Sequence, residues 1–142
     1  MNKDNIDLSR FIKGHENSYR LALLEIKEGR KRSHWMWYIF PQIEGLGFSD
    51  ISQYYAISSL DEAKAYLNDM TLGSHMHELC KALLELDTDD AESIFGFPDY
   101  LKLKSSMTLF DMAAPDNEMF SKVLDKFFNG QRDEKTIDHI CG

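Results

Sequence analysis

The chain has little cysteine and proline: its 142 residues contain two cysteines, three prolines and eight glycines. Cys80 and Cys141 form no CxxC pair and no disulfide or metal framework, so we expect free thiols in a reducing compartment and no metal site. The longest apolar run, Trp35–Pro41, is too short to span a bilayer, and the N-terminus has no apolar signal-peptide core. These absences predict a cytoplasmic protein that makes no use of a membrane.

Positive charge is also scarce, with 16 Lys and Arg against 24 Asp and Glu and a net charge of −8. An acidic chain disfavours general nucleic-acid binding and binding to anionic membranes. A hydrophobic content of 43% is nevertheless enough for a packed core, which excludes intrinsic disorder. The length is typical of one domain. We therefore expect a single domain over residues 1–142, with room for disorder in the first few residues.

Strand signals are weak, whereas helix start and stop signals recur along the chain. Ser59 and Glu62 form a capping box, and Leu72, Met76 and Leu83 begin an apolar stripe at helical spacing. The fold class predicted is all-α: an irregular, compact domain of about eight to ten mostly short helices. We expect helices near 7–13, 17–28, 34–40, 50–56, 60–68, 72–83, 91–95, 98–114, 117–128 and 134–140.

The segment Arg30–Gln42 is unlike the rest of the chain, because three consecutive cations precede a run of large, mostly aromatic residues. The aromatics can be simple core packing. The cations, placed just before an expected helix N-terminus, are unfavourable there unless a negative group lies close. That group can be a bound anion, or it can be the acidic run at 84–100 of the same chain.

The first alternative defines a candidate ligand site with cations, aromatic walls and polar contacts. Ser106 is included because its hydroxyl falls at the edge of a buried helix face, where it bonds either its own i−4 carbonyl or a polar pocket; Ser105 and Thr108 are expected to point outward. The ligand-binding residues predicted are Arg30, Lys31, Arg32, His34, Trp37, Gln42 and Ser106.

Several runs in the chain resemble the bacterial family DUF1810, namely the one from Gly29 to Gln42, the Gly-Leu-Gly at 45–47 and the one from Lys102 to Phe110. The resemblance covers nearly the whole chain and implies a compact all-helical fold. It implies no function. Some members have carried the label calpastatin, but inhibitors of that type are disordered and repetitive, and this chain is neither.

No sequence signature assigns a reaction or a cofactor: the chain has no P-loop, no HExxH and no Gly-x-Ser-x-Gly. We therefore predict no cofactor, and only His34 is a weak candidate for acid–base catalysis. The leading hypothesis is binding of a small anionic ligand, phosphorylated or nucleotide-like. The alternative is a protein-interaction module with an unknown partner, in which the Arg/Trp run is structural. Sealed tryptophans and internally paired arginines would weaken the ligand hypothesis, exposed tryptophans around a flat patch would favour a protein partner, and a concave pocket with free guanidinium groups would favour a ligand.

Overall fold

The computed structural model describes residues 6–142, so the first few residues, where the sequence leaves room for disorder, fall largely outside the described part. Over residues 6–142 the chain forms helices and no strand, which confirms the all-α prediction. Nine helices lie in this range: α1 (Ser9–Lys27), α2 (Met36–Ile39), α3 (Asp50–Tyr55), α4 (Leu60–Asn68), α5 (Met70–Glu85), α6 (Ala91–Phe95), α7 (Asp99–Ala113), α8 (Glu118–Phe128) and α9 (Glu134–Cys141).

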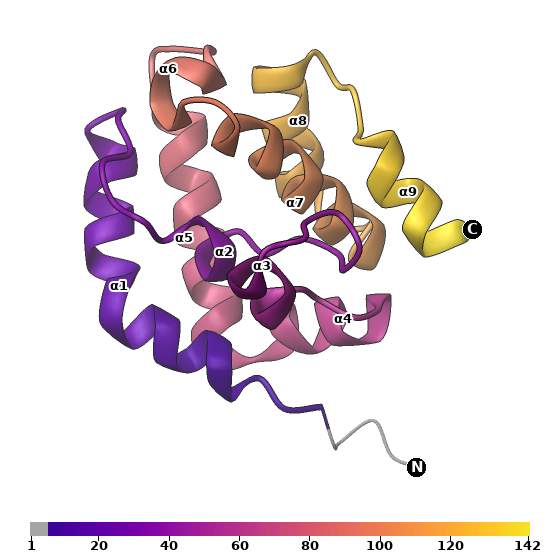
Figure 1. The fold of residues 1–142 in the computed structure, drawn as a ribbon. Coiled ribbons are helices and arrows are strands. Elements are labelled where there is room, and N and C mark those ends of the chain that lie inside the picture. The colour runs from indigo at the N-terminus through magenta and orange to yellow at the C-terminus, as the bar shows by residue number, and fades with distance from the viewer. Residues whose placement is uncertain (1–5) are drawn as a thin grey trace.

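Helix α7 is the centre of the fold. Helices α4, α6, α8 and α9 pack around it, while α1 lies along α5 on the other side of the core (Figure 1). As a result every residue from Ser105 to Asp111 is buried, on all faces of the helix. The sequence pattern predicts only one buried face for this segment, because the spacing of apolar residues does not reveal a helix that other helices surround.

Helix α1 is longer than expected, since the two helices predicted at 7–13 and 17–28 are one continuous helix. Gly14 lies in its middle, and the ring of Tyr38 packs directly over it. A Cβ atom at this position would overlap that ring. Gly14 therefore permits a close approach between two elements and does not end a helix.

The helix caps were predicted well where a side chain directly precedes the helix. Ser59 accepts from the Glu62 N–H, and Asp133 accepts from the Thr136 N–H, as expected. Two predicted helix starts are off by one or two residues: α5 is capped by Asp69 and begins at Met70, against a predicted 72, and α8 is capped by Asn117 and begins at Glu118, against a predicted 117. In both cases a neighbouring residue with a side-chain oxygen satisfies the same free N–H groups.

Helix α2 is much shorter than the predicted 34–40 segment, and its first residue is Met36. The preceding N–H groups of Arg32 and Ser33 donate to the carboxylate of Glu25, so these residues are held outside the helix. The cations at 30–32 therefore do not lie at a helix N-terminus. This corrects the physical argument that first singled them out.

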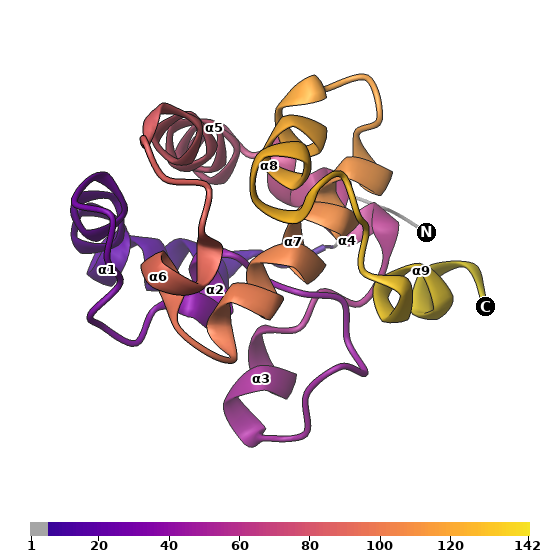
Figure 2. The same cartoon turned by 90° about the horizontal axis from the view of Figure 1, so that it is seen from above.

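Residues 44–56, which include α3, form an excursion that we call the flap. Its two ends are joined by the bridge between Ile43 and Ile57, with Glu44 N donating to Ile57 O and Ile57 N donating to Gln42 O, both at 2.8 Å. No residue of α3 is buried. Figure 2 shows α3 projecting from the body of the molecule.

Within residues 6–142, no helix combines the length and the apolar character needed to cross a membrane.

Candidate functional site

Two adjoining cavities lie where the flap meets the body of the molecule, and we call them together the Trp37 groove. Their volumes are about 630 and 480 Å³. Both are lined by Trp37 and Gln42 from the α2 region and by Phe48 and Ser52 from the flap. Two of the residues predicted from sequence, Trp37 and Gln42, therefore belong to the same concave site.

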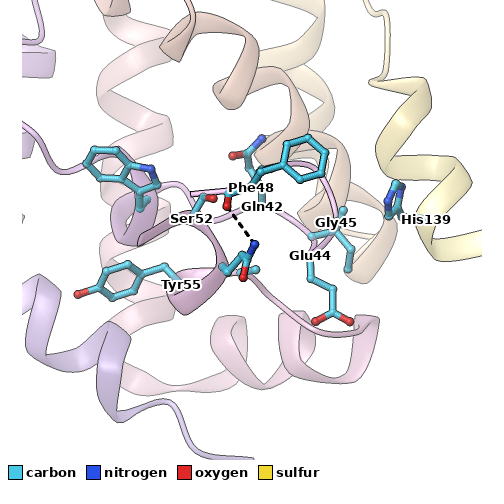
Figure 3. Close-up of a pocket in the computed structure, with 12 residues that line it drawn as sticks. Gln42, Glu44, Gly45, Phe48, Ser52, Tyr55 and His139 are labelled. Carbon is cyan, nitrogen blue, oxygen red and sulfur yellow. Dashed lines mark hydrogen bonds between the residues drawn. The ribbon is translucent and has the colours of Figure 1, made fainter. Parts of the chain in front are cut away.

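The larger cavity lies between the flap and α9. In Figure 3, Tyr55 and His139 lie at opposite ends of it, with Phe48 and Ser52 between them. The Nε2 amide of Gln53 donates to the Phe48 carbonyl at 3.1 Å, which fixes the backbone of the flap. Gly45 has φ +97° and faces the His139 ring so closely that a Cβ atom would overlap it. Only glycine fits both conditions.

The smaller cavity carries the positive charge of the groove. It is lined by Lys102 from α7 and Lys135 from α9, together with Ser105 and Asp133. Asp133 Oδ2 accepts from the Ser105 hydroxyl at 3.1 Å and from the Thr136 hydroxyl at 2.6 Å. These bonds tie the start of α9 to the centre of α7, so the polar wall of the cavity is held by buried structure.

Lys102 stands directly over the indole that lines the groove. Its Nζ is 5.2 Å from the centroid of the Trp37 ring and 3.2 Å from Asp99 Oδ1. The other oxygen of Asp99 lies 3.0 Å from Lys31 Nζ, and Lys31 is in turn 5.1 Å from the Trp35 ring. Asp99 thus neutralises only one of two lysines, and the group keeps one net positive charge beside Trp37.

The three consecutive cations do not converge on one site. Lys31 is nearly buried, with 8% of its side chain exposed, and pairs with Asp99 of the acidic 84–100 run. Arg32 is exposed and pairs with Glu28 at 2.6 Å, whereas Arg30 is exposed and forms no ion pair within residues 6–142. None of the three lines a cavity of the groove. The three cations therefore do not form the predicted anion-binding cluster, because each of their side chains has different surroundings.

The two tryptophans also have different surroundings. Trp35 is 1% exposed and packs edge-on against Phe95, so it is core. Trp37 is half-buried and lines the groove. The conditions that would weaken the ligand hypothesis are therefore met only in part. Trp35 is sealed and Arg32 is paired, while Trp37 remains accessible.

His34 and Ser106 are not brought to the groove. His34 is exposed and lies outside both cavities, so it does not line the groove together with Trp37. Ser106 Oγ is fully buried and has no hydrogen-bond partner in the described residues, neither its i−4 carbonyl nor a pocket group. Ser105 and Thr108, expected to point outward, are buried instead. The Thr108 hydroxyl donates to its i−4 carbonyl, and the Ser105 hydroxyl lies within hydrogen-bond distance of both its i−4 carbonyl and Asp133, which share its one proton.

Glu25 organises the loop that carries the cations, a role that was not predicted from the sequence. This carboxylate is 3% exposed and accepts from the N–H groups of Arg32 and Ser33, the Ser33 hydroxyl and the Trp35 indole N–H. Burial acts to raise the pKa of Glu25, but these hydrogen bonds outweigh it and lower the pKa below its ordinary value. In the sequence, Glu25 is one acidic residue of a predicted helix, and nothing in the pattern around it indicates this role.

A second buried group lies where α1 meets α5. The Nδ1 atoms of His15 and His75 are 2.9 Å apart, and His15 Nε2 lies 3.0 Å from the Tyr38 carbonyl and 2.9 Å from the Tyr66 hydroxyl. Burial lowers the pKa of His15 to about 4, although the bond to Tyr38 acts to raise it. No group of three or more His, Cys, Asp or Glu in residues 6–142 is placed to hold a metal ion.

The comparisons with known proteins agree with the fold. The sequence profile of the family described as "Protein of unknown function (DUF1810)" matches residues 5–140. The crystal structure of the conserved hypothetical protein Rv1873 from Mycobacterium tuberculosis is similar, with 43% sequence identity, a TM-score of 0.93, and coverage of 96% of this chain and 97% of that one. No curated protein matches. The chain therefore belongs to the DUF1810 family.

Proposed function

We propose that the Trp37 groove binds a small anionic ligand, phosphorylated or nucleotide-like. The observation that carries this proposal is the position of Lys102 over Trp37 in a cavity that also contains Lys135. A lysine that is only half neutralised by Asp99 has charge available for a phosphate or carboxylate. Lys102 and Lys135 take the role first given to Arg30, Lys31 and Arg32.

The polar groups around these lysines suit a ligand that also has hydrogen-bonding atoms. Gln42 can both donate and accept, and the Asp133 carboxylate can accept from a hydroxyl or amine. Trp37 provides a flat apolar surface. The free state of both thiols, buried Cys80 and exposed Cys141, supports placing this function in the cytoplasm.

The proposal predicts that Lys102→Ala weakens binding of phosphate monoesters by about tenfold or more, because a charged hydrogen bond contributes roughly 1.5–3 kcal/mol. Binding is measured by isothermal titration calorimetry after a thermal-shift screen, in which a ligand at about 100 times its Kd stabilises the fold by roughly 2.7 kcal/mol. Lys122→Ala is the matched control, since Lys122 is an exposed lysine on α8 far from the groove residues in sequence and outside both cavities.

Arg30→Ala is the second control, and we expect it to bind normally. If Arg30→Ala loses binding while Lys102→Ala retains it, the site lies at the basic run and the assignment to the groove is wrong. If no phosphate ester stabilises the wild-type protein, the proposed function is wrong.

A protein-interaction role is the second candidate, and one observation favours it. The flap exposes three large apolar side chains, Phe48, Ile51 and Tyr54. An apolar surface on a projecting segment is typical of a contact with another protein. A flap variant with Ile51 and Tyr54 changed to serine, which leaves Phe48 and both cavities intact, would then lose a partner and keep ligand binding at Lys102.

A further inference from the structure

Phe48 is the most exposed aromatic ring of the described chain, and it stands at the mouth of the groove. It is 87% exposed, yet it lines both cavities. Trp37 is the other aromatic residue that lines both cavities. Neither ring is stacked on another aromatic side chain, whereas Trp35 packs against Phe40 and Phe95. Two aromatic faces thus border one groove without an aromatic partner of their own.

The loop that carries Phe48 is anchored to the body at its two sides, and Leu46 also packs against the core. On one side Arg10 donates to the carbonyls of Tyr54 and Ala56, both at 2.8 Å. On the other side Gly45 packs against His139. The side-chain hydrogen bonds of residues 46–53 are all made within the flap, such as the Ser49 hydroxyl to Ser52 at 3.0 Å. Within residues 6–142, no side-chain hydrogen bond therefore joins this part of the flap to the body of the molecule.

We infer that Trp37 and Phe48 are the two walls of an aromatic clamp, which takes a flat ring of the ligand while Lys102 holds its anionic group. This inference rests on the proposed function and adds the ligand class: a phosphate ester that also carries a flat ring, either directly, as in an aryl phosphate, or through a sugar, as in a nucleotide. Phe48 is the specificity-determining residue, because it discriminates ligands with a ring from ligands that carry the phosphate alone. In the bound state the ligand ring stacks on Phe48 and covers the face of this side chain that is exposed in the free protein.

The two parts of the ligand can be tested separately with phenyl phosphate and methyl phosphate, which carry the same anion with and without a ring. We expect the wild-type protein to bind phenyl phosphate roughly 5- to 150-fold more tightly than methyl phosphate, the range given by stacking on aromatic side chains. Phe48→Ala should reduce this ratio at least threefold and leave the affinity for methyl phosphate unchanged. Phe48→Tyr keeps a ring and should keep the ratio.

Tyr54→Ala is the matched control, because Tyr54 is another exposed aromatic residue of the flap that lines neither cavity. A Trp35→Phe variant leaves Trp37 as the only indole, so quenching of its fluorescence by phenyl phosphate reports the stacking directly. If both phosphates bind and Phe48→Ala leaves their ratio unchanged, the clamp is wrong and the anion site stands. If neither phosphate binds the wild-type protein, the proposed function fails and the clamp fails with it.

Discussion

Replacing Glu25 with alanine is expected to destabilise the protein by about 3 kcal/mol, because it removes the acceptor of several partly or fully buried donors. The indole N–H of Trp35 donates to Glu25 at 2.9 Å in the core, and this is its one hydrogen bond in the part of the chain that the structure describes. The N–H groups of Arg32 and Ser33 also lose their partner. For a chain of this length the loss corresponds to a fall in Tm of about 10 °C.

Glu28→Ala is the matched control for this experiment. Glu28 is exposed and pairs only with the exposed Arg32, so its removal should cost no more than about 0.5 kcal/mol. Glu25→Gln should lie between the two, since an amide keeps the shape and some acceptor capacity but loses the charge. Urea unfolding followed by tryptophan fluorescence measures all three variants. Equal stability of Glu25→Ala and Glu28→Ala would show that the loop is held by other contacts.

The lowered pKa of Glu25 also fixes the direction of its pH dependence. A carboxyl that is more acidic in the folded state contributes its stability above its ordinary pKa, and the contribution is lost as the pH falls through the lower folded value. Acid below about pH 4.5 should therefore destabilise the wild-type protein more than Glu25→Ala.

The second large effect is expected from His15, whose pKa is about 4 in the folded protein against about 6.5 in an unfolded chain. Above pH 6.5 the ring is neutral in both states, and pH has no effect through it. Between pH 6.5 and 4 the unfolded chain binds a proton that the folded state does not. Stability should fall by about 2 kcal/mol at pH 5 and about 3 kcal/mol at pH 4.

The groups that face this ring explain why it stays neutral. The carbonyl of Tyr38 can only accept, so His15 Nε2 carries the ring proton and donates it there, with the Tyr66 hydroxyl also 2.9 Å away, and its Nδ1 accepts from His75 Nδ1. Protonating His15 would place a second proton between the two Nδ1 atoms unless His75 changes tautomer. Burial also lowers the pKa of His75, against the charges of Glu78 and Asp69, which raise it. The pair therefore resists charge on either ring.

His15→Gln tests this account. The variant should be less stable at pH 7.5, since buried hydrogen bonds are lost, but its stability should change less between pH 6.5 and 5 than that of the wild type. His77→Gln, which changes an exposed histidine on the same helix as His75, should keep the wild-type pH dependence. A wild-type stability that is constant from pH 7 to 5, or an unchanged slope in His15→Gln, would contradict the buried neutral pair.

Local sequence signals determined the helical elements of this protein. Caps such as Ser59 and Asp133 act within three residues, and apolar spacing along α5 needs no distant partner, so both are readable from the chain. The same holds for the resemblance to DUF1810. The predicted break between the helices at 7–13 and 17–28 was wrong. The contact that Gly14 permits there, with the Tyr38 ring, comes from a residue far along the chain.

The candidate site was only half visible in the sequence, because a groove is made by segments that the fold brings together. Trp37 and Gln42 were found, since they belong to an unusual run. Lys102 and Lys135 stand alone among ordinary helical residues, and only packing places them beside that indole. The run of three cations looked like one site, yet tertiary structure gave each a different environment. A sequence shows only which charged residues are adjacent along the chain, whereas binding depends on where their side chains converge in space.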